Sequence, residues 1–183
     1  TLSFLDQKLP EFYKNAQTQS IDFKNSIKLS NISFKYPSNK NLIIKKLNLE
    51  IKKGEIIGFI GKTGSGKSTL FDLFMGILDP LEGSLLVDGR IINENNKKSW
   101  FNSISHVQQD IFLTDNSILE NIAFGVPRNL IDIEKVKRCA KLAEINQFID
   151  SLPNSHQSLI GERGVKLSGG QRQRLGIARA LYK

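Results

Sequence analysis

Cysteine and histidine are almost absent from this sequence of 183 residues. Cys139 is the single cysteine, so no disulfide can form within the chain, which fits a reducing compartment. We expect Cys139 to be a small buried side chain in the helical stretch 134–148. Of the two histidines, His156 has no companions at metal-ligand spacing, and His106 is expected to be packed in a strand. Neither a disulfide scaffold nor a histidine-based metal centre is indicated.

Long apolar runs and an acidic balance are also missing. No stretch approaches the roughly 20 apolar residues of a membrane-spanning helix, and the N-terminal residues show no cleavable signal pattern. The net charge is +8, from 26 Lys and Arg against 18 Asp and Glu. The lysines of residues 1–53 are scattered rather than grouped with aromatic residues, so we expect a solvated surface and no nucleic-acid partner. Contact with anionic lipid headgroups is the alternative.

A glycine-rich segment, residues 61–68, is the most specific local motif. It reads Gly-Lys-Thr-Gly-Ser-Gly-Lys-Ser and fits the pattern G-x-x-x-x-G-K-[ST] at every position. The apolar run 55–60 before it predicts a buried strand, and helical spacing of apolar residues after it predicts a helix that begins near Gly66. Strand, loop and helix are the context that this motif needs. The apolar helix positions are Leu70, Phe71, Phe74, Ile77 and Leu78.

The residue types of this loop suit a phosphate site better than a chance Gly/Ser turn. Gly61, Gly64 and Gly66 let the backbone bend so that its N–H groups point at anionic oxygens. The positive end of the following helix dipole adds to this attraction. Lys67 supplies a positive charge for the β- and γ-phosphates, and Ser68 is placed to ligate Mg²⁺ through its hydroxyl.

A second glycine motif, Leu-Ser-Gly-Gly-Gln, lies at residues 167–171. Residues 171–181 after it are predicted to be helical, with Leu175, Ala178 and Leu181 on one apolar face. A helix N-terminus behind Ser168 and two glycines is a second place where phosphate oxygens can bind. Taken alone this turn would be weak evidence, since turns of this type are common.

Together the two motifs, 101 positions apart (168 − 67), resemble those of the nucleotide-binding domain of ATP-binding cassette (ABC) proteins. The resemblance runs from about Ile27 to the last residue. It implies an α/β fold, a P-loop NTPase (RecA-like) core with an antiparallel β subdomain and an α-helical subdomain, incomplete at the C-terminus. It also implies ATP and Mg²⁺, and two domains paired head to tail. Ser168 and Gly170 would then contact the γ-phosphate held by the partner's Lys67.

The same resemblance implies roles for individual residues. Tyr36 matches the aromatic that stacks on adenine, the alternative being a half-buried strand aromatic. Gln109 matches the glutamine that reaches Mg²⁺ and the attacking water, and Gln108 is the neighbour with which it could be confused. Lys67 and Gln109 are thus the catalytic candidates, and Ser68 and Gln109 the metal ligands. The implied nucleotide-binding residues are Tyr36, Gly61, Thr63, Gly64, Ser65, Gly66, Lys67, Ser68, Thr69, Ser168, Gly169, Gly170 and Gln171.

Two further segments resemble the exporter branch of the family. Residues 112–122 are similar to the segment after the Q-loop of exporters, and residues 161–164, Gly-Glu-Arg-Gly, to their X-loop. Exporters usually carry Thr-Glu just ahead of this glycine, whereas this chain has Ser-Leu-Ile at 158–160. The branch implies a transmembrane domain in the same polypeptide and a location at the cytoplasmic face of a membrane, the bacterial inner membrane. Residues 1–26 would then be the linker, and residues 27–183 a partial ABC domain with its helical subdomain at about 117–175.

The family's later motifs, an apolar strand ending in Asp-Glu and a switch histidine, do not follow residue 171 in this sequence. We expect the catalytic glutamate to lie outside the chain, and the chain alone to be inactive and only partly folded. Other predicted elements are strands within 27–53 with a polar turn at 37–41, a strand and turn at 82–90, and a strand at 103–108. Residues 117–152 are predicted to be mainly helical, and residues 1–8 form a further candidate helix that Pro10 would end.

Three alternatives to an exporter remain on sequence grounds. An importer's separate ATP-binding subunit and a soluble ABC ATPase acting on DNA or ribosomes both share the two motifs. The gap between the motifs leaves no room for the long coiled coil of the DNA-repair type. A non-hydrolysing nucleotide switch would require a substituted catalytic glutamate, on which this sequence is silent.

Overall fold

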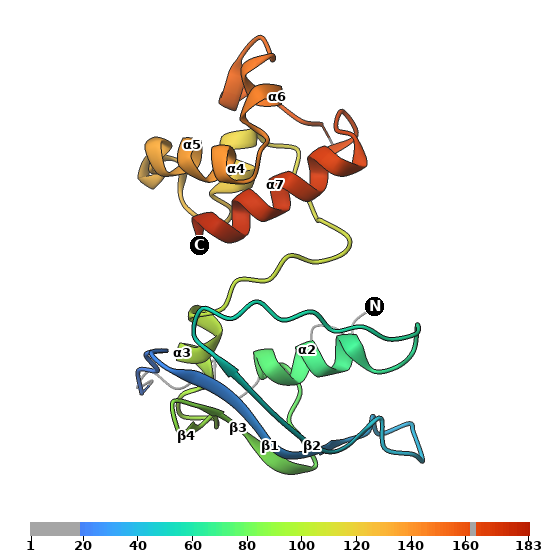
Figure 1. The fold of residues 1–183 in the computed structure, drawn as a ribbon. Coiled ribbons are helices and arrows are strands. Elements are labelled where there is room, and N and C mark those ends of the chain that lie inside the picture. The colour runs from blue at the N-terminus through green and yellow to red at the C-terminus, as the bar shows by residue number, and fades with distance from the viewer. Residues whose placement is uncertain (1–18, 162–163) are drawn as a thin grey trace, which may run out of the picture. The chain divides into compact units, whose positions relative to one another are not determined.

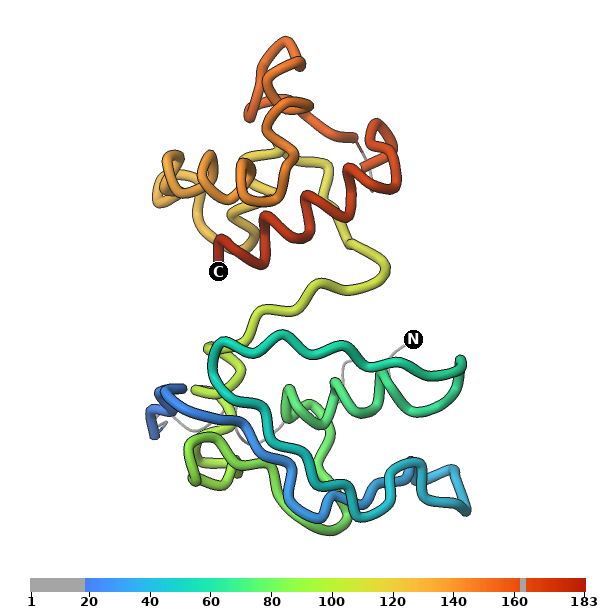
Figure 2. The backbone as a smooth tube through the Cα atoms, viewed as in Figure 1, coloured from blue at the N-terminus to red at the C-terminus, as the bar shows by residue number. Residues whose placement is uncertain are grey.

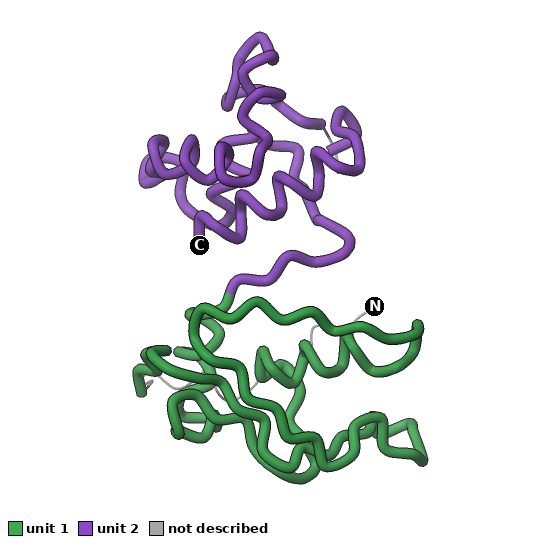
Figure 3. The backbone as a smooth tube through the Cα atoms, in the orientation of Figure 1, with its two compact units in different colours: residues 1–104 green, residues 105–183 purple. Residues whose placement is uncertain are grey.

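The computed structural model describes residues 19–161 and 164–183, which form two compact units (Figures 1 and 3). Unit 1 comprises the described residues up to Ile104, and unit 2 comprises Ser105–Lys183. Each unit is described by itself. The helix predicted at residues 1–8 and two residues of the X-loop, Glu162 and Arg163, lie outside the described residues.

Unit 1 is built on a four-stranded antiparallel sheet with the order β2-β1-β3-β4. The strands are β1 (Ser26–Phe34), β2 (Ile44–Lys52), β3 (Glu82–Val87) and β4 (Arg90–Ile91). Leu29 of β1 lies opposite Leu49 of β2 on one side and Leu85 of β3 on the other. The two strands predicted around the 37–41 turn, and the strand and turn at 82–90, are confirmed.

Two helices, α2 (Lys67–Met75) and α3 (Lys97–Asn102), pack against one face of this sheet (Figure 1). The shared core is apolar because the inward positions of β1 and β3 meet the buried side of α2. Trp100 of α3 is buried there, and its Nε1 donates a hydrogen bond to the carbonyl of Phe74 at 3.0 Å. The helix ends at Met75 with Gly76 in the left-handed conformation, so Ile77 and Leu78 lie beyond it, contrary to the sequence prediction. The fully or nearly buried core side chains include Ile21, Leu29, Ile32, Phe34, Leu73, Leu85, Val87 and Trp100.

Two predicted strands are not formed. Residues 55–62 and 104–108 have no regular secondary structure, and His106 is exposed rather than packed in a strand. Ile56 and Ile60 are completely exposed, although their run of apolar residues favours burial. A strand is stable only when a neighbour takes up its backbone hydrogen bonds, and none of the described strands lies beside either run. Figure 2 follows the first run as an open backbone path between β2 and α2.

Unit 2 is helical. Its α-helices are α4 (Ile118–Ile122), α5 (Ile133–Leu142), α6 (Asn146–Asp150) and α7 (Gly169–Tyr182), with short 3-10 helices at Arg128–Leu130 and Ser155–Gln157. Helices α4 and α5 pack on α7 around a common apolar core, which confirms the predicted helical content. Cys139 is buried in α5, as predicted. No helix of the described residues is long and apolar enough to cross a membrane.

The apolar face of α7 differs by one residue from the prediction. Leu175 and Ala178 are fully buried, but Leu181 is 47% exposed and Tyr182 is buried instead. The hydroxyl of Tyr182 accepts a hydrogen bond from the backbone N–H of Asp132 at 3.1 Å. Tyr182, which follows the predicted segment, therefore closes the core at the end of the helix.

Candidate functional site

The glycine-rich loop of residues 61–66 curls around the amine of Lys67. The Lys67 Nζ donates hydrogen bonds to the carbonyl oxygens of Gly61 at 2.8 Å and Lys62 at 2.9 Å. The amine is thereby held over the loop rather than extended away from it. This places a positive charge beside the loop and the start of α2, where backbone N–H groups can bind a phosphate chain.

Glycine is required where the loop turns into α2. Gly66 adopts a φ of 88°, a region that residues with a side chain rarely enter. A Cβ at this position would also lie 2.9 Å from Ile43 Cγ2, which is too close. The backbone therefore reaches the helix by a path that only glycine allows, and Ile43 is a supporting residue that the motif itself does not reveal.

The first turn of α2 offers anion-binding groups next to Lys67. No side chain caps the N-terminus of this nine-residue helix at Gly66, so the positive end of its dipole faces the loop. Ser68 is exposed in this turn, where its hydroxyl could hold a divalent cation, whereas Thr69 is buried. Thr63, Gly64 and Ser65 are exposed along the loop.

Tyr36 lies beside the same helix start. Its hydroxyl is 3.3 Å from the Thr69 Oγ1, and its ring meets Phe34 edge to face with centroids 5.1 Å apart. The ring is half-buried, so one part of it stays open for another planar group. A cavity of about 520 Å³ adjoins the loop, lined by Ser38, Asn39, Lys40, Asn41, Leu42, Ile43, Gly64 and Ser65. The adenine candidate and the phosphate candidate are thus brought together, and Thr69 links them.

The second glycine motif forms the N-terminus of α7. Ser168 Oγ accepts a hydrogen bond from the Gln171 N–H at 3.3 Å, and Gln171 Oε1 accepts one from the Ser168 N–H at 2.8 Å. This reciprocal capping box defines the start of the helix. Ser168, Gly169 and Gly170 are all exposed, while Leu167 is buried and anchors the turn. The motif therefore presents an open helix N-terminus.

Comparison with known proteins decides the family. The family model for ABC transporters matches residues 44–183, which is more than half of the chain and includes both glycine motifs. The chain belongs to the ABC transporter family. The match covers residues 61–68, the predicted P-loop, and residues 167–171, the predicted signature sequence.

The relatives of this ABC domain are longer proteins. The chain is 39% identical over 160 residues to a protein of Bacillus subtilis named as a multidrug export ATP-binding/permease protein, covering 87% of the chain and 27% of that protein. It is 43% identical over 162 residues to a protein of the same description from Staphylococcus aureus, covering 88% of the chain and 28% of that protein. A bacterial Atm1-family ABC exporter solved with ATP bound superimposes with a TM-score of 0.82 at 34% identity, covering 92% of the chain and 29% of that structure. The chain thus spans a little over a quarter of the length of these relatives.

This match confirms the predicted P-loop NTPase fold with its antiparallel sheet and helices. Membership of the ABC family also indicates that the nucleotide this domain binds is ATP. The described residues contain no group of three or more His, Cys, Asp or Glu that could hold a metal ion.

The candidate Q-loop of this ABC domain lies in unit 2. Gln108 and Gln109 are both exposed, so burial does not distinguish them, and the choice of Gln109 stays a prediction. The P-loop and Tyr36 belong to unit 1, whereas Gln109 and the signature belong to unit 2. Each unit thus carries one part of the predicted site.

A supporting arginine in unit 2 escaped the sequence analysis. Arg179 of α7 donates hydrogen bonds from Nε to the carbonyl of Asn121 at 2.8 Å and from Nη1 to the carbonyl of Phe112 at 2.7 Å. Burial lowers the pKa of this guanidinium, although an arginine remains charged at neutral pH. These contacts fix the signature helix to the segment that follows the Q-loop. An arginine on an apolar helix face is the signal that could have pointed to it.

Proposed function

We propose that this chain is the ATP-binding part of an ABC exporter, in which ATP binding and hydrolysis drive movement of a substrate across a membrane. The observation that carries the proposal is the P-loop with Lys67 held over it beside the uncapped end of α2. The names of the relatives, which combine an ATP-binding part with a permease, support the export role. They favour an exporter over a separate importer subunit or a soluble ABC ATPase.

In this proposal Tyr36, Lys67 and Ser68 of unit 1 and Gln109 of unit 2 each have a distinct task. Lys67 and the loop N–H groups bind the β- and γ-phosphates and offset their charge. Tyr36 stacks on the adenine, with Thr69 holding its hydroxyl. Ser68 and Gln109 would hold Mg²⁺, which supplies charge neutralisation at the phosphates when bound. Gln109 also orients the water that attacks the γ-phosphorus, and ADP leaves as the bond to its bridging oxygen breaks.

The signature of a second domain completes the site. Ser168 and Gly170 of one copy would contact the γ-phosphate of the ATP held by Lys67 of the other, because the exposed end of α7 can approach an anion from outside. The partner is a second copy of this domain or a related one, placed head to tail. The carboxylate that accepts the proton of the attacking water is proposed to belong to the longer protein outside this chain, so this chain alone would be inactive.

The longer protein is proposed to carry a transmembrane domain in the same polypeptide, with the ATP domain at the cytoplasmic face of the bacterial inner membrane. Residues 1–26, which end at the first residue of β1, would link the two domains. The pair of ATP domains would close when ATP binds, because ATP binds the closed state more tightly, and would reopen after hydrolysis. The linker would transmit these movements to the membrane domain.

Two substitutions in the full-length protein test this proposal. Lys67→Ala should abolish ATP binding or hydrolysis. Ser168→Arg should leave ATP affinity within about threefold, a free-energy change below about 1 kcal/mol, while it abolishes hydrolysis because the bulky cation blocks closure. Retention of full ATPase activity by Ser168→Arg would contradict the two-copy sandwich, and its retention by Lys67→Ala would contradict the site itself.

A further inference from the structure

The seven residues that precede β1, residues 19–25, are folded onto unit 1. The backbone N–H of Gln19 donates to the carbonyl of Asn95 at 3.1 Å, and that of Ile21 donates to the Ser99 Oγ at 2.8 Å. The Ile21 side chain is only 5% exposed and belongs to the core of unit 1. This segment therefore follows a defined path before the first strand begins.

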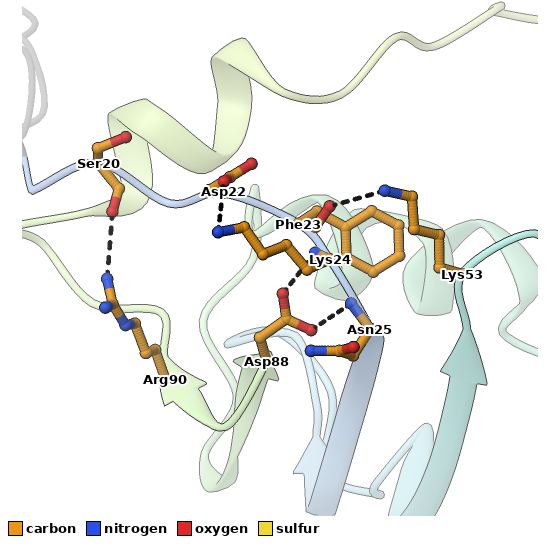
Figure 4. A network of polar contacts seen from close by, with 8 residues as sticks. All are labelled: Ser20, Asp22, Phe23, Lys24, Asn25, Lys53, Asp88 and Arg90. Atoms are coloured by element: carbon orange, nitrogen blue, oxygen red, sulfur yellow. Dashed lines mark hydrogen bonds and ion pairs between the residues drawn. The ribbon is translucent and has the colours of Figure 1, made fainter.

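A single carboxylate holds the end of the segment next to β1 (Figure 4). Asp88 accepts hydrogen bonds from three consecutive backbone N–H groups, those of Lys24 at 2.5 Å, Asn25 at 2.7 Å and Ser26 at 2.8 Å. Lys24 is bound by one carboxylate oxygen, and Asn25 and Ser26 by the other. The N–H groups of Lys24 and Ser26 lower the pKa of Asp88, since they stabilise its charged form.

Asp88 is itself held rigidly in the turn between β3 and β4. It has a left-handed backbone, with a φ of 49°, and its own N–H donates to the carbonyl of Ser26 at 2.9 Å. Two cations also reach the segment, Arg90 from β4 and Lys53 from the turn that follows β2. Arg90 Nη1 lies 3.4 Å from the carbonyl of Ser20, and Lys53 Nζ lies 3.5 Å from that of Phe23. Figure 4 shows these contacts arriving from different parts of the sheet.

We propose that Asp88 is a latch that ties residues 19–25 to the β3–β4 turn, so that this segment moves with the ATP-binding unit. The coupling role of the latch rests on the proposed function, in which this segment continues toward a membrane domain. While Asp88 holds the segment, a movement of unit 1 is transmitted to the part of the chain that precedes residue 19. With the latch open, the N–H groups of residues 24–26 are released and only the contacts of residues 19–23 hold the segment, so that it opens more often. When it opens fully, its seven residues add up to about 23 Å of slack at 3.3 Å per residue.

Asp88→Asn in the full-length protein opens the latch with little disturbance of the turn. Among uncharged residues other than glycine, asparagine tolerates the left-handed backbone of this position well. It offers one acceptor oxygen instead of two, so its amide nitrogen must face either Lys24 N–H or the N–H groups of Asn25 and Ser26. The matched control is Asp22→Asn, which removes a carboxylate of the same segment that makes only an exposed ion pair with Lys24 at 3.2 Å.

The first measurement is the rate of tryptic cleavage after Lys24. Cleavage should be roughly tenfold faster in Asp88→Asn than in wild type, because cleavage follows the population of the opened segment. In Asp22→Asn it should be unchanged. Ser99→Ala, which releases Ile21 N–H without touching Asp88, should give a smaller increase. Equal cleavage rates in wild type and Asp88→Asn would overturn the latch.

The second measurement tests the coupling role in proteoliposomes, with ethidium as the transported probe. Asp88→Asn should keep the rate of ATP hydrolysis within about twofold of wild type, since Asp88 is not part of the P-loop. The number of ethidium molecules moved per ATP hydrolysed should fall several-fold. Normal coupling despite faster cleavage would overturn that role. A wild-type protein that neither hydrolyses ATP nor moves ethidium would instead count against the proposed function, and the cleavage rates would still decide whether the latch exists.

Discussion

Gly66 is the residue at which the P-loop becomes α2, and two separate features restrict it to glycine. Its φ of 88° is left-handed, and a Cβ would lie 2.9 Å from Ile43. Gly54, after β2, shares the first feature with a φ of 86°, but a Cβ there would meet nothing within 4 Å. Substitutions at these two glycines can therefore distinguish the effect of backbone strain from the effect of the Ile43 contact on the site.

We predict that Gly66→Ala and Gly54→Ala each cost about 1–2 kcal/mol of stability through the left-handed backbone. Only Gly66→Ala should also weaken ATP binding, by roughly tenfold or about 1.4 kcal/mol, because relief of the Ile43 contact shifts the loop. Titration of full-length protein with a fluorescent ATP analogue measures this. Equal affinity in both variants would show that the Ile43 contact is not important for the loop.

Tyr36 combines a ring that could stack on adenine with a hydroxyl that contacts Thr69. If stacking dominates, Tyr36→Phe should bind ATP nearly as well as wild type. Tyr36→Ala should lose about 1–3 kcal/mol, the usual value of a base stacked on an aromatic ring. Isothermal titration with ATP distinguishes the two variants. Equal losses in both would assign the role of Tyr36 to its hydroxyl and not to its ring.

At the scale of secondary-structure elements, α7 matters most because it carries the signature at its N-terminus. Leu175 is fully buried on this helix, whereas Leu181, at the far end, is 47% exposed. Leu175→Ala should destabilise α7 by about 2–5 kcal/mol, because the removed atoms leave a cavity. Leu181→Ala should change its stability by less than about 0.5 kcal/mol.

Native-state hydrogen exchange of the α7 amides in full-length protein provides this measurement. It is suited to a multidomain protein, because it reports the opening of one element without requiring global two-state unfolding. A large loss of protection in Leu181→Ala would show that a surface outside unit 2 covers this leucine. Full protection in Leu175→Ala would contradict the assigned core of unit 2.

Elements whose partners are close in sequence could be predicted from the sequence. The connection between strands β1 and β2 contains the polar turn predicted at 37–41, and the helical content predicted for residues 117–152 is present in unit 2. The run 55–60 was wrongly predicted as a strand, because its apolar composition indicates a preference for burial but does not supply a hydrogen-bonded neighbour, and the strand predicted at 103–108 is not formed either. The end of α2 was missed since Gly76 stops the helix before Ile77.

At the scale of the whole molecule, the two motifs of the site were predictable because each is local. The P-loop needs only three closely spaced glycines before Lys67, and the signature needs only a capped helix start at Ser168. The supporting contacts were not predictable, since they join residues far apart in sequence. Ile43 against Gly66, Tyr36 against Thr69 and Asp88 against Lys24 each depend on how the chain folds back.

The central claim is that Lys67 of one copy and Ser168 of another act on the same ATP. Full-length Lys67→Ala and Ser168→Arg copies, carrying different tags, can be co-expressed and purified as mixed pairs. Each pure variant should be inactive. The mixed pair should recover activity, up to roughly half of wild type, because one site then combines an intact P-loop with an intact signature. Mixed pairs as inactive as the pure variants would contradict the head-to-tail site.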